Sequence, residues 1–460
     1  MTRDRRAKAL EEAAEQEAER RVQDIYREIL RRAPEHDFEP TLDRVRQVCD
    51  LLGGVQAAAP VLHLTGTNGK TSTARMVERL LRELGLRTGR FTSPHLSSVR
   101  ERIAIDGEPI PASRFVEVWD DVEPYLRMVD ESSQAAGGPR LSFFEVFTVM
   151  AFAAFADAPV EVVVLEVGMG GRWDATNVAD GVVEVVTPVA RDHERWLGHT
   201  LEEIAGEKAG IITPASTVVS AAQREEVAAV LAAVAAEQGA RLVVEDRDVA
   251  VLERTLAVGG QVVTLQGLGG VYADVFLPLH GAHQAHNALL ALVAVEAFLG
   301  GGALDAGVVE AAFGGVESPG RLEVVRRSPT ILVDAAHNVA GAEALVAALD
   351  ETFGFARLVG VVGVLADKDA EGLLATLEPV LAEVVVTRST SARSLDVDEL
   401  AEVARDVFGE DRVHVAERLD DALDVAVARA ELTGEPRGTG VLATGSVVLV
   451  AEVRVLLGVG

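Results

Sequence analysis

The feature that most constrains the fold of this chain is a regular alternation of short apolar segments with amphipathic ones. In a first series, strands are predicted at 61–64, 160–167 and 182–186, and helices at 71–83, at 288–299 and from residue 41 onward. In a second series, strands are predicted at 331–334, 358–364, 383–387 and 440–444, with helices between them. Strands that alternate with helices form parallel sheets covered on both faces. The sequence therefore predicts an α/β protein.

The chain is too long, at 460 residues, for one ordinary core, so two or three domains are expected. The turn at 317–321 separates the two series and is the predicted hinge, with a larger domain at 36–317 and a smaller one at 318–460. Residues 1–35 combine Glu and Arg at i,i+4 spacing with few large apolar residues, which predicts a solvated helical extension. A β-rich insertion is predicted at 241–280, with strands at 241–244, 261–265 and 272–277.

The charge balance and the cysteine count exclude several classes of protein. With 43 Lys and Arg against 72 Asp and Glu, the net charge is −29, which opposes binding to nucleic acid. The single cysteine, Cys49, cannot form an intramolecular disulfide, which fits a reducing compartment. There is no secretory signal and no apolar run approaching the ~20 residues that span a bilayer. We expect a cytoplasmic protein that binds neither nucleic acid nor membrane.

A glycine-rich turn, GTNGKTS at 66–72, joins a predicted buried strand to a predicted helix. Successive backbone N–H groups at such a turn, together with the helix N-terminus, bind phosphate oxygens. Lys70 would reach the β- and γ-phosphates, and Thr71 and Ser72 offer hydroxyls to phosphate or Mg²⁺. The strict GxxxxGK[ST] pattern fails, because its first glycine falls on Leu64. The alternative is a plain strand–turn–helix corner with a surface lysine, but such a corner has no use for a lysine followed by two hydroxyls.

Polar side chains also follow other predicted strands, at the carboxyl edge where open α/β sheets bind ligands. Glu166 lies within an apolar strand, and a buried carboxylate needs a partner: a cation such as Mg²⁺, or a buried arginine. Ser93 ends a short strand, and His193 follows the strand near 182–189; a lone histidine would carry little weight, but beside Ser93 and Glu166 it favours a metal site. Lys208 lies near the end of an amphipathic helix, where a dipole-stabilised surface lysine is equally compatible with the spacing.

Seven motifs occur in a characteristic order along the chain: GTNGKTS, FTSPHL, GMGGRWDATN, DHERWLGHTLEEIAGEKAGI, HQAHNA, SPGRLE and DAAHN. Each alone is weak, but together and in this order they are highly specific. The chain resembles the dihydrofolate synthase/folylpolyglutamate synthase family of the Mur ligase superfamily. TGSVVLVAEV, near the C-terminus, extends the resemblance. It implies a P-loop ATPase domain with a parallel sheet, like the central domain of Mur ligases, and a smaller Rossmann-like C-terminal domain that serves glutamate ligation.

The resemblance also implies roles for individual residues. It places ATP contacts at Thr67, Asn68, Gly69, Lys70, Thr71, Ser72, Asn287, Arg321 and Asp334. It places Mg²⁺ ligands at Ser93, Glu166, His193 and Lys208, the last after carbamylation by CO₂. Catalytic roles are implied for Lys70, Lys208 and His337, and the pterin site is implied at Ser142, Phe143, Phe144, Glu145, Trp173, Asp174 and Ala175.

The chain departs from the usual family pattern at three positions. Thr71 and Ala335 stand where many members have glycine, and Val339 stands where many have proline. None of these changes removes a ligand group, so we expect differences in loop shape and not a loss of activity.

The reaction implied is ligation of L-glutamate to dihydropteroate, to the γ-carboxylate of a reduced folate, or to both, with ATP as phosphate donor and an acyl phosphate as intermediate. A cell-wall Mur ligase acting on a nucleotide-sugar peptide shares the phosphate loop, but SPHL and GGRWDATN favour the folate branch. An alternative of another class is a nucleotide-binding regulatory ATPase. A bifunctional, monomeric enzyme is the expectation that the resemblance favours.

Overall fold

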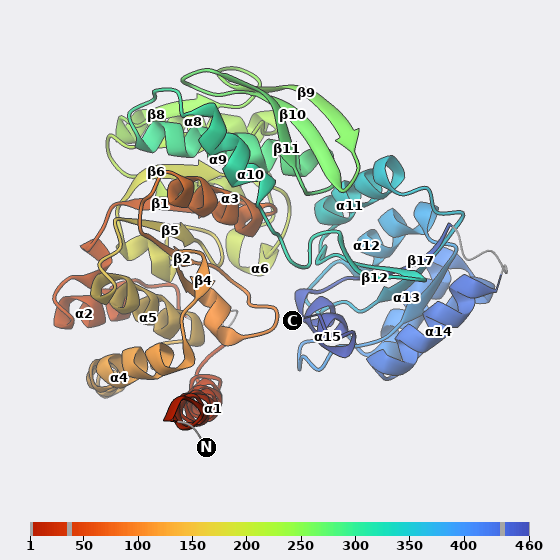
Figure 1. Cartoon of the computed structure of the whole chain (residues 1–460), viewed down its shortest axis with the longest axis horizontal. Coiled ribbons are helices and arrows are strands. Elements are labelled where there is room, and N and C mark those ends of the chain that lie inside the picture. Colours follow the sequence, from red (N-terminus) through yellow and green to blue (C-terminus); the bar gives the residue numbers. More distant parts are fainter. Residues whose placement is uncertain (1–2, 35–38, 433–437, 460) are drawn as a thin grey trace.

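A computed structural model describes residues 3–34, 39–432 and 438–459. Figure 1 shows two bodies side by side, one coloured red to green and the other teal to blue. The chain passes between them after α10 (Ala306–Gly314) and before β12 (Glu323–Arg327). Each body contains a mainly parallel sheet of its own, which confirms the predicted α/β class. The domain boundary at residue 318 stays a prediction.

The first body is built on an eight-stranded sheet in the order β4-β3-β2-β5-β1-β6-β7-β8. The six strands β2, β5, β1, β6, β7 and β8 run parallel to one another. At the edge beside β2, the strands β3 and β4 pair in antiparallel fashion. Its strands are β1 (Val61–Thr65), β2 (Thr88–Phe91), β3 (Ile103–Ile105), β4 (Glu108–Pro109), β5 (Val162–Glu166), β6 (Gly181–Val186), β7 (Thr217–Ser220) and β8 (Arg241–Val244). Because β5, β1 and β6 are adjacent and parallel, the loops that follow them meet at one edge of the sheet.

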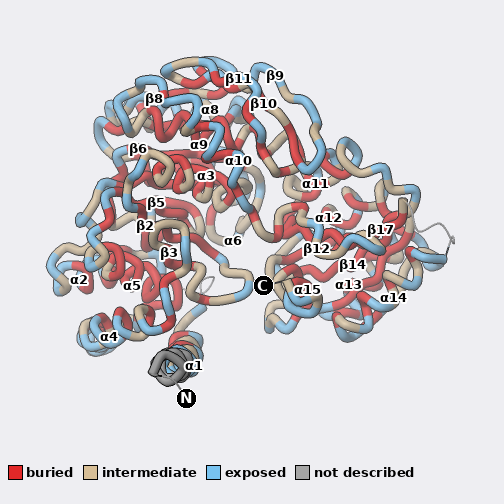
Figure 2. Tube along the Cα trace, viewed as in Figure 1, coloured by how far each residue is buried: buried red, intermediate tan, exposed pale blue. Residues whose placement is uncertain are grey.

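Helices cover both faces of this sheet. In Figure 2 the strands between them are largely red, the colour of buried residues. On one face, α3 (Lys70–Glu83) and α9 (Ala282–Phe298) share a core with Leu62 and Leu64 of β1. On the other, α2 (Asp43–Leu51), α4 (Ala112–Ala135) and α5 (Phe143–Asp157) share a core with Val163 and Leu165 of β5. A third cluster joins α7 (Leu201–Lys208) and α8 (Glu225–Gln238). The apolar pattern of α2 predicts Val45, Val48 and Leu51 on its buried side, but Leu51 is exposed whereas Val45 and Val48 are buried.

The N-terminal helix α1 (Arg3–Ile29) corrects one expectation. It was predicted to be solvated, but Val22, Ile25 and Ile29 in its second half are fully buried. These three residues follow the spacing of one helix face and join the core shared with α4. Charged residues dominate the composition of the segment, so this narrow apolar stripe is easily missed in a count of large apolar residues.

The predicted insertion divides into two parts. β8 extends the eight-stranded sheet, whereas β9 (Ala250–Ala257), β10 (Gly260–Gln266) and β11 (Val271–Leu277) form a separate antiparallel sheet. The strand at 250–257 was not predicted, and its mixed burial pattern explains why, since polar and apolar residues do not alternate strictly along it. In Figure 1 this sheet lies above α9 and reaches toward the second body.

The second body is built on a six-stranded sheet in the order β12-β13-β17-β14-β15-β16. All pairs are parallel except β12 with β13. Its remaining strands are β13 (Thr330–Val333), β14 (Arg357–Val362), β15 (Glu383–Val386), β16 (Val413–Val415) and β17 (Thr439–Thr444). One face carries α11 (Val339–Thr352), α12 (Ala370–Leu377) and α13 (Val397–Phe408), and the other α14 (Leu419–Glu431) and α15 (Val447–Leu456). Within the ranges that the structure describes, no helix is long and apolar enough to cross a membrane.

Candidate active site

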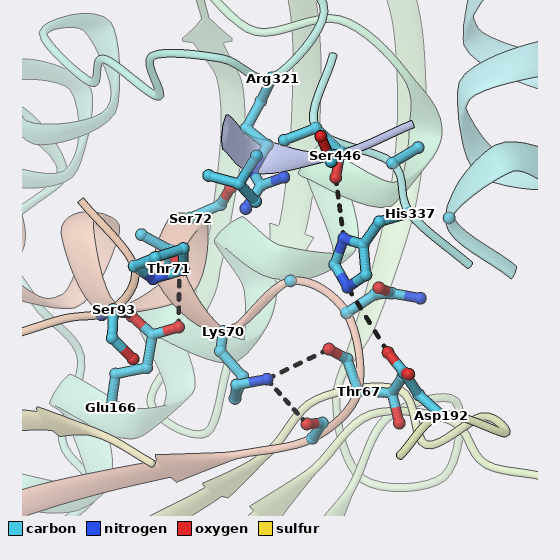
Figure 3. A pocket seen from close by; sticks show the side chains of 18 of the residues that line it. Thr67, Lys70, Thr71, Ser72, Ser93, Glu166, Asp192, Arg321, His337 and Ser446 are labelled. Atoms are coloured by element: carbon cyan, nitrogen blue, oxygen red, sulfur yellow. Dashed lines mark hydrogen bonds and ion pairs between the residues drawn. The ribbon is translucent and has the colours of Figure 1, made fainter. Parts of the chain in front are cut away.

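A cavity of about 500 Å³ lies between the two bodies, and the loops after β1, β5, β6 and β13 all contribute to its wall. Figure 3 shows side chains from both sides of this cleft pointing toward one another. The structure brings fourteen of the predicted site residues to this one cavity: Thr67, Asn68, Gly69, Lys70, Thr71, Ser72, Ser93, Glu166, His193, Lys208, Asn287, Arg321, Asp334 and His337. Their individual roles stay predictions, but their proximity is a property of the fold.

The phosphate loop leaves β1 and turns directly into α3. Gly69 has φ 90°, a backbone conformation that is strained for other residues, and a Cβ atom placed on it would lie 2.6 Å from Oδ1 of Asn287 in α9. Lys70 Nζ donates to the carbonyl oxygens of Gly66 at 3.0 Å and Thr67 at 3.1 Å (Figure 3). Burial lowers the pKa of Lys70, while the carboxylates of Glu166 and Asp192 oppose that shift. The lysine therefore folds back on its own loop, within reach of any phosphate bound there.

Glu166 ends β5 and is only 2% exposed. Its Oε1 accepts from the Thr71 hydroxyl at 2.7 Å, and its Oε2 accepts from the Ser93 backbone N–H at 3.3 Å. Burial raises the pKa of Glu166, and the nearby Lys70 and Thr71 lower it. No ion pair within 4.0 Å joins Glu166 to an arginine in the described part of the chain, although the charge of Arg321 also lowers the pKa of Glu166.

His193 follows β6 and adopts a left-handed backbone with φ 53° and ψ 35°. Non-glycine residues rarely take this conformation, and it often marks functional sites. Burial, with Lys368 nearby, lowers the pKa of His193 to about 3, so its imidazole is neutral and able to bind a metal. Among the described residues no three His, Cys, Asp or Glu side chains gather as a metal cluster. The Glu166 carboxylate and the Ser93 hydroxyl are nevertheless hard oxygen ligands of the kind that Mg²⁺ takes while it keeps several of its waters, and His193 lines the same cavity.

Lys208 is the last residue of α7, but it is not a surface lysine. Its side chain is buried, and Nζ donates to the carbonyl oxygen of Gly66 at 2.7 Å. Burial, reinforced by Lys70, lowers its pKa from 10.5 to about 7. Lys208 thus lies at the helix end, as expected, but the interpretation as a surface lysine is wrong, because the amine is buried and faces the phosphate loop.

The second body supplies Arg321, Asp334 and His337 to the cleft. Leu322 has φ 42°, a left-handed conformation that is strained for a branched side chain, and its N–H donates to Asp334 Oδ2 at 2.7 Å. Asp334 Oδ1 also accepts from the Ala336 N–H at 2.8 Å. This carboxylate thereby ties together the turn that carries Arg321 and the turn that leads to His337.

Three residues that sequence reasoning missed link the two bodies across the cleft: Asp192, Asn338 and Lys368. Asp192, from the loop after β6, forms a buried ion pair with Lys368 and accepts from Asn338 Nδ2 at 3.0 Å. His337 Nε2 lies 3.5 Å from the same carboxylate (Figure 3). Asn338 in turn exchanges amide hydrogen bonds of 3.0 and 3.2 Å with Asn68 of the phosphate loop. We call Asp192, Lys368, Asn338 and Asn68 the cross-cleft clasp.

A smaller pocket adjoins the main cavity and shares Gly168, Met169, His193 and Arg393 with it. Six of the seven residues expected at a pterin site line this pocket: Ser142, Phe144, Glu145, Trp173, Asp174 and Ala175. Ser142 and Glu145 also form the capping box that starts α5. We call this the ring pocket.

Phe143 was expected in the same set, but it does not line the ring pocket. Its ring packs on Phe147 with centroids 4.8 Å apart, and the guanidinium of Arg102 lies 4.9 Å from its centre. At the first turn of a helix, successive side chains point in different directions. Phe144 therefore faces the pocket while Phe143 faces the core.

Comparisons with known proteins agree with this geometry. The Mur ligase middle domain matches residues 137–295, and the Mur ligase glutamate ligase domain matches residues 320–447. A dihydrofolate synthase/folylpolyglutamate synthase from Mycobacterium tuberculosis is 52% identical over 447 residues, covering 93% of this chain and 92% of that protein. One from Bacillus subtilis is 32% identical over 427 residues, covering 90% and 94%.

Solved structures give the same result. The chain superposes on M. tuberculosis folylpolyglutamate synthase complexed with ADP and AMPPCP with a TM-score of 0.91, at 51% identity, covering 95% of this chain and 98% of that one. It superposes on a folylpolyglutamate synthase from Thermotoga maritima with a TM-score of 0.79, at 32% identity, covering 96% and 97%.

Proposed function

Since the chain belongs to the dihydrofolate synthase/folylpolyglutamate synthase family of Mur-type ligases, we propose that it uses ATP to join L-glutamate to dihydropteroate and to reduced folates. The observation that carries this proposal is the single cavity that holds the phosphate loop, Glu166, and Arg321 and Asp334 of the second body. The ring pocket beside it is of the kind that suits a flat heterocycle, because Phe144 and Trp173 offer aromatic surface.

In the first chemical step, an oxygen of the acceptor carboxylate attacks the γ-phosphorus of ATP. The bond from that phosphorus to the bridging oxygen breaks, ADP leaves, and an acyl phosphate forms. Lys70 would stabilise the negative charge on the transferred phosphoryl group. Its present hydrogen bonds to Gly66 and Thr67 hold the ammonium at the loop, so little rearrangement is needed.

In the second step, the α-amine of L-glutamate attacks the acyl carbon. A tetrahedral intermediate forms, phosphate leaves, and the amine loses a proton as the amide is made. His337 would sit beside the phosphate or the incoming glutamate, with Nδ1 bonded to the carbonyl oxygen of Ala335 at 2.9 Å. Enclosure between the two bodies would keep water from hydrolysing the acyl phosphate.

Ser93, Glu166 and His193 would hold Mg²⁺, because together they offer a hydroxyl, a carboxylate and a neutral imidazole in one cavity. When bound, the ion would neutralise charge on the phosphates of ATP. Lys208 would join it as a carbamate, since its depressed pKa leaves much of the amine uncharged near neutral pH and able to add CO₂. We further propose that the enzyme is bifunctional and acts as a monomer.

The proposal is tested by measuring ADP release from the purified protein with ATP and Mg²⁺. We expect turnover with dihydropteroate plus L-glutamate, and with tetrahydrofolate plus L-glutamate, but little turnover when L-glutamate is omitted. Product mass identifies which acceptor was extended. A matched control is Lys70→Met, which should abolish both activities together.

Two results would contradict the folate assignment. Turnover that required a UDP-muramyl peptide would indicate a cell-wall ligase, and ATP hydrolysis independent of glutamate would indicate a regulatory ATPase. Activity with one acceptor alone would overturn only the bifunctional part of the proposal.

A further inference from the structure

A histidine is buried in a central strand of the eight-stranded sheet, at a position where a parallel strand normally carries an apolar residue. His63 belongs to β1, whose five residues are all buried, and its own side chain is fully buried. In the sheet register it stands between Leu165 of β5 and Glu184 of β6. Glu184 bonds Thr213, at 2.8 Å, and not His63. The imidazole therefore takes its partner from outside the sheet.

That partner is Thr176, in the short helical turn after the GRWD segment. His63 Nε2 lies 2.8 Å from Thr176 Oγ1, and Thr176 Oγ1 lies 2.5 Å from Asp174 Oδ1. Asp174 also accepts from the backbone N–H groups of Thr176 and Met169, both at 3.0 Å. Asp174 lines the ring pocket, so a continuous series of hydrogen bonds runs from the central strand to the pocket wall.

The chemistry of the three groups sets the direction of these hydrogen bonds. Burial raises the pKa of Asp174 to about 6, so at pH 8 it is a carboxylate and can only accept. The one hydroxyl proton of Thr176 therefore goes to Asp174, and the Thr176 oxygen accepts from His63. Burial lowers the pKa of His63 to about 3, so the ring is neutral and carries its proton on Nε2.

We propose that His63 is a positioning residue for the ring pocket, which acts through Thr176 to hold the carboxylate of Asp174 in place in the wall of the pocket that receives a flat heterocycle. The inference rests on the proposed function, because it assumes that the ring pocket receives such a heterocycle. It assigns a role to a residue that lies outside both the main cavity and the ring pocket.

A purely structural role accounts poorly for this histidine. Its Nδ1 has no hydrogen-bond partner among the described residues, and an unsatisfied buried polar atom destabilises a fold. A leucine or phenylalanine would fill the space without that unfavourable contribution. What an apolar side chain cannot supply is the N–H that faces Thr176, and bonds arranged in series strengthen one another in a buried setting.

The test compares His63→Leu, His63→Gln and Thr176→Val with the wild type in the glutamate ligation assay at pH 8. Loss of one hydrogen bond in the series should raise the KM for dihydropteroate about three- to ten-fold in His63→Leu and Thr176→Val. The KM for ATP should stay within about two-fold in both. His63→Gln, whose side-chain amide keeps a donor, should recover most of the affinity for the acceptor.

A spectroscopic measurement tests the proton placement independently. The ¹⁵N spectrum of the histidine rings, with His63 assigned by its loss in His63→Gln, should show a neutral ring protonated on Nε2. If His63→Leu does not fold, the KM values for dihydropteroate of His63→Gln and Thr176→Val still test the proposal. Thr176→Val breaks the series of hydrogen bonds at a residue outside the sheet.

The outcomes separate this inference from the proposed function. Asp174→Asn serves as the reference: if the wild type does not turn over dihydropteroate, or Asp174→Asn leaves its KM unchanged, the proposed function of the ring pocket fails. If Asp174→Asn raises that KM but Thr176→Val and His63→Leu do not, the role of His63 alone is overturned. An Nδ1-protonated ring in the wild type would overturn it as well.

Discussion

Lys208 reaches the cleft with a buried amine, and burial disfavours the protonated form of that amine. Burial is the larger cause that lowers its pKa to about 7, and the positive charge of Lys70 is the smaller one. Carbamylation consumes the uncharged amine and releases one proton, so at a fixed concentration of dissolved CO₂ the carbamate should increase as pH rises through about 7. We expect a ¹³C NMR carbamate signal from enzyme equilibrated with ¹³C-labelled bicarbonate at pH 8. Lys208→Arg should lack it, and a signal that survives in Lys208→Arg would contradict the assignment.

Thr71 follows Lys70 in the phosphate loop, and its hydroxyl donates to Glu166 at 2.7 Å. Thr71→Val removes this bond but keeps the shape of the side chain, so the carboxylate loses one of its donors. We expect the Mg²⁺ concentration for half-maximal activity to change about two- to ten-fold, with a smaller effect on the KM for ATP. Thr73→Val is the matched control, because Thr73 bonds the carbonyl of Gly69 within its own helix and does not reach Glu166. Equal effects of the two substitutions would contradict a special role for Thr71.

The residues that could be predicted from sequence are those whose local pattern carries the chemistry. Lys70 follows a glycine turn, and Glu166 interrupts an apolar strand, so each is conspicuous in its own segment. Asp192 adjoins His193 in the same loop, but its importance depends on Lys368, 176 residues further along the chain. Such a pair forms only where the two folded bodies meet, so no local sequence pattern predicts it.

At the scale of elements, α1 should contribute measurably to the stability of the first body. Ile25 is fully buried in the core shared with α4, whereas Leu30, just beyond the helix, is 52% exposed. Ile25→Ala should lower the free energy of unfolding by about 2–5 kcal/mol, through lost burial and a residual cavity. Leu30→Ala, the matched control, should change it by about 0.5 kcal/mol or less. Urea unfolding followed by tryptophan fluorescence measures both, and similar values would contradict the packing of α1.

The elements that could be predicted are the buried parallel strands and the helices between them, because continuous apolar runs identify them. Six strands were missed: β3, β4, β7, β9, β12 and β16. β7 is buried and parallel, but its four residues include only two apolar ones, and β3 and β4 are only three and two residues long. β9 and β12 lie in antiparallel pairings and β16 at a sheet edge, and all three are partly exposed, so their residues are mixed in polarity. The stripe in α1 was missed for a related reason, since three buried residues are outweighed by the charges around them.

At the scale of the whole molecule, the cross-cleft clasp should favour the closed arrangement of the two bodies. Lys368 and Asp192 are both nearly buried, and breaking a buried pair by removing one partner typically costs about 3–5 kcal/mol. Lys368→Met should therefore lower kcat at least about ten-fold and increase the radius of gyration measured by X-ray scattering. Arg254→Met removes another pair that joins the bodies, between Arg254 and Glu351, but one that is more exposed. That control should stay within about two-fold of the wild-type kcat.

The reciprocal amide bonds between Asn68 and Asn338 have a consequence for inheritance. Each side chain satisfies the other as both donor and acceptor, and Asn338 also caps α11 by accepting from the Gly341 N–H. A substitution at one position leaves a partly buried amide unmatched at the other, although the two residues lie 270 positions apart. Natural variants should therefore change the two positions together or at neither, and a single change at residue 338 should behave in the laboratory like a defect of the phosphate loop itself.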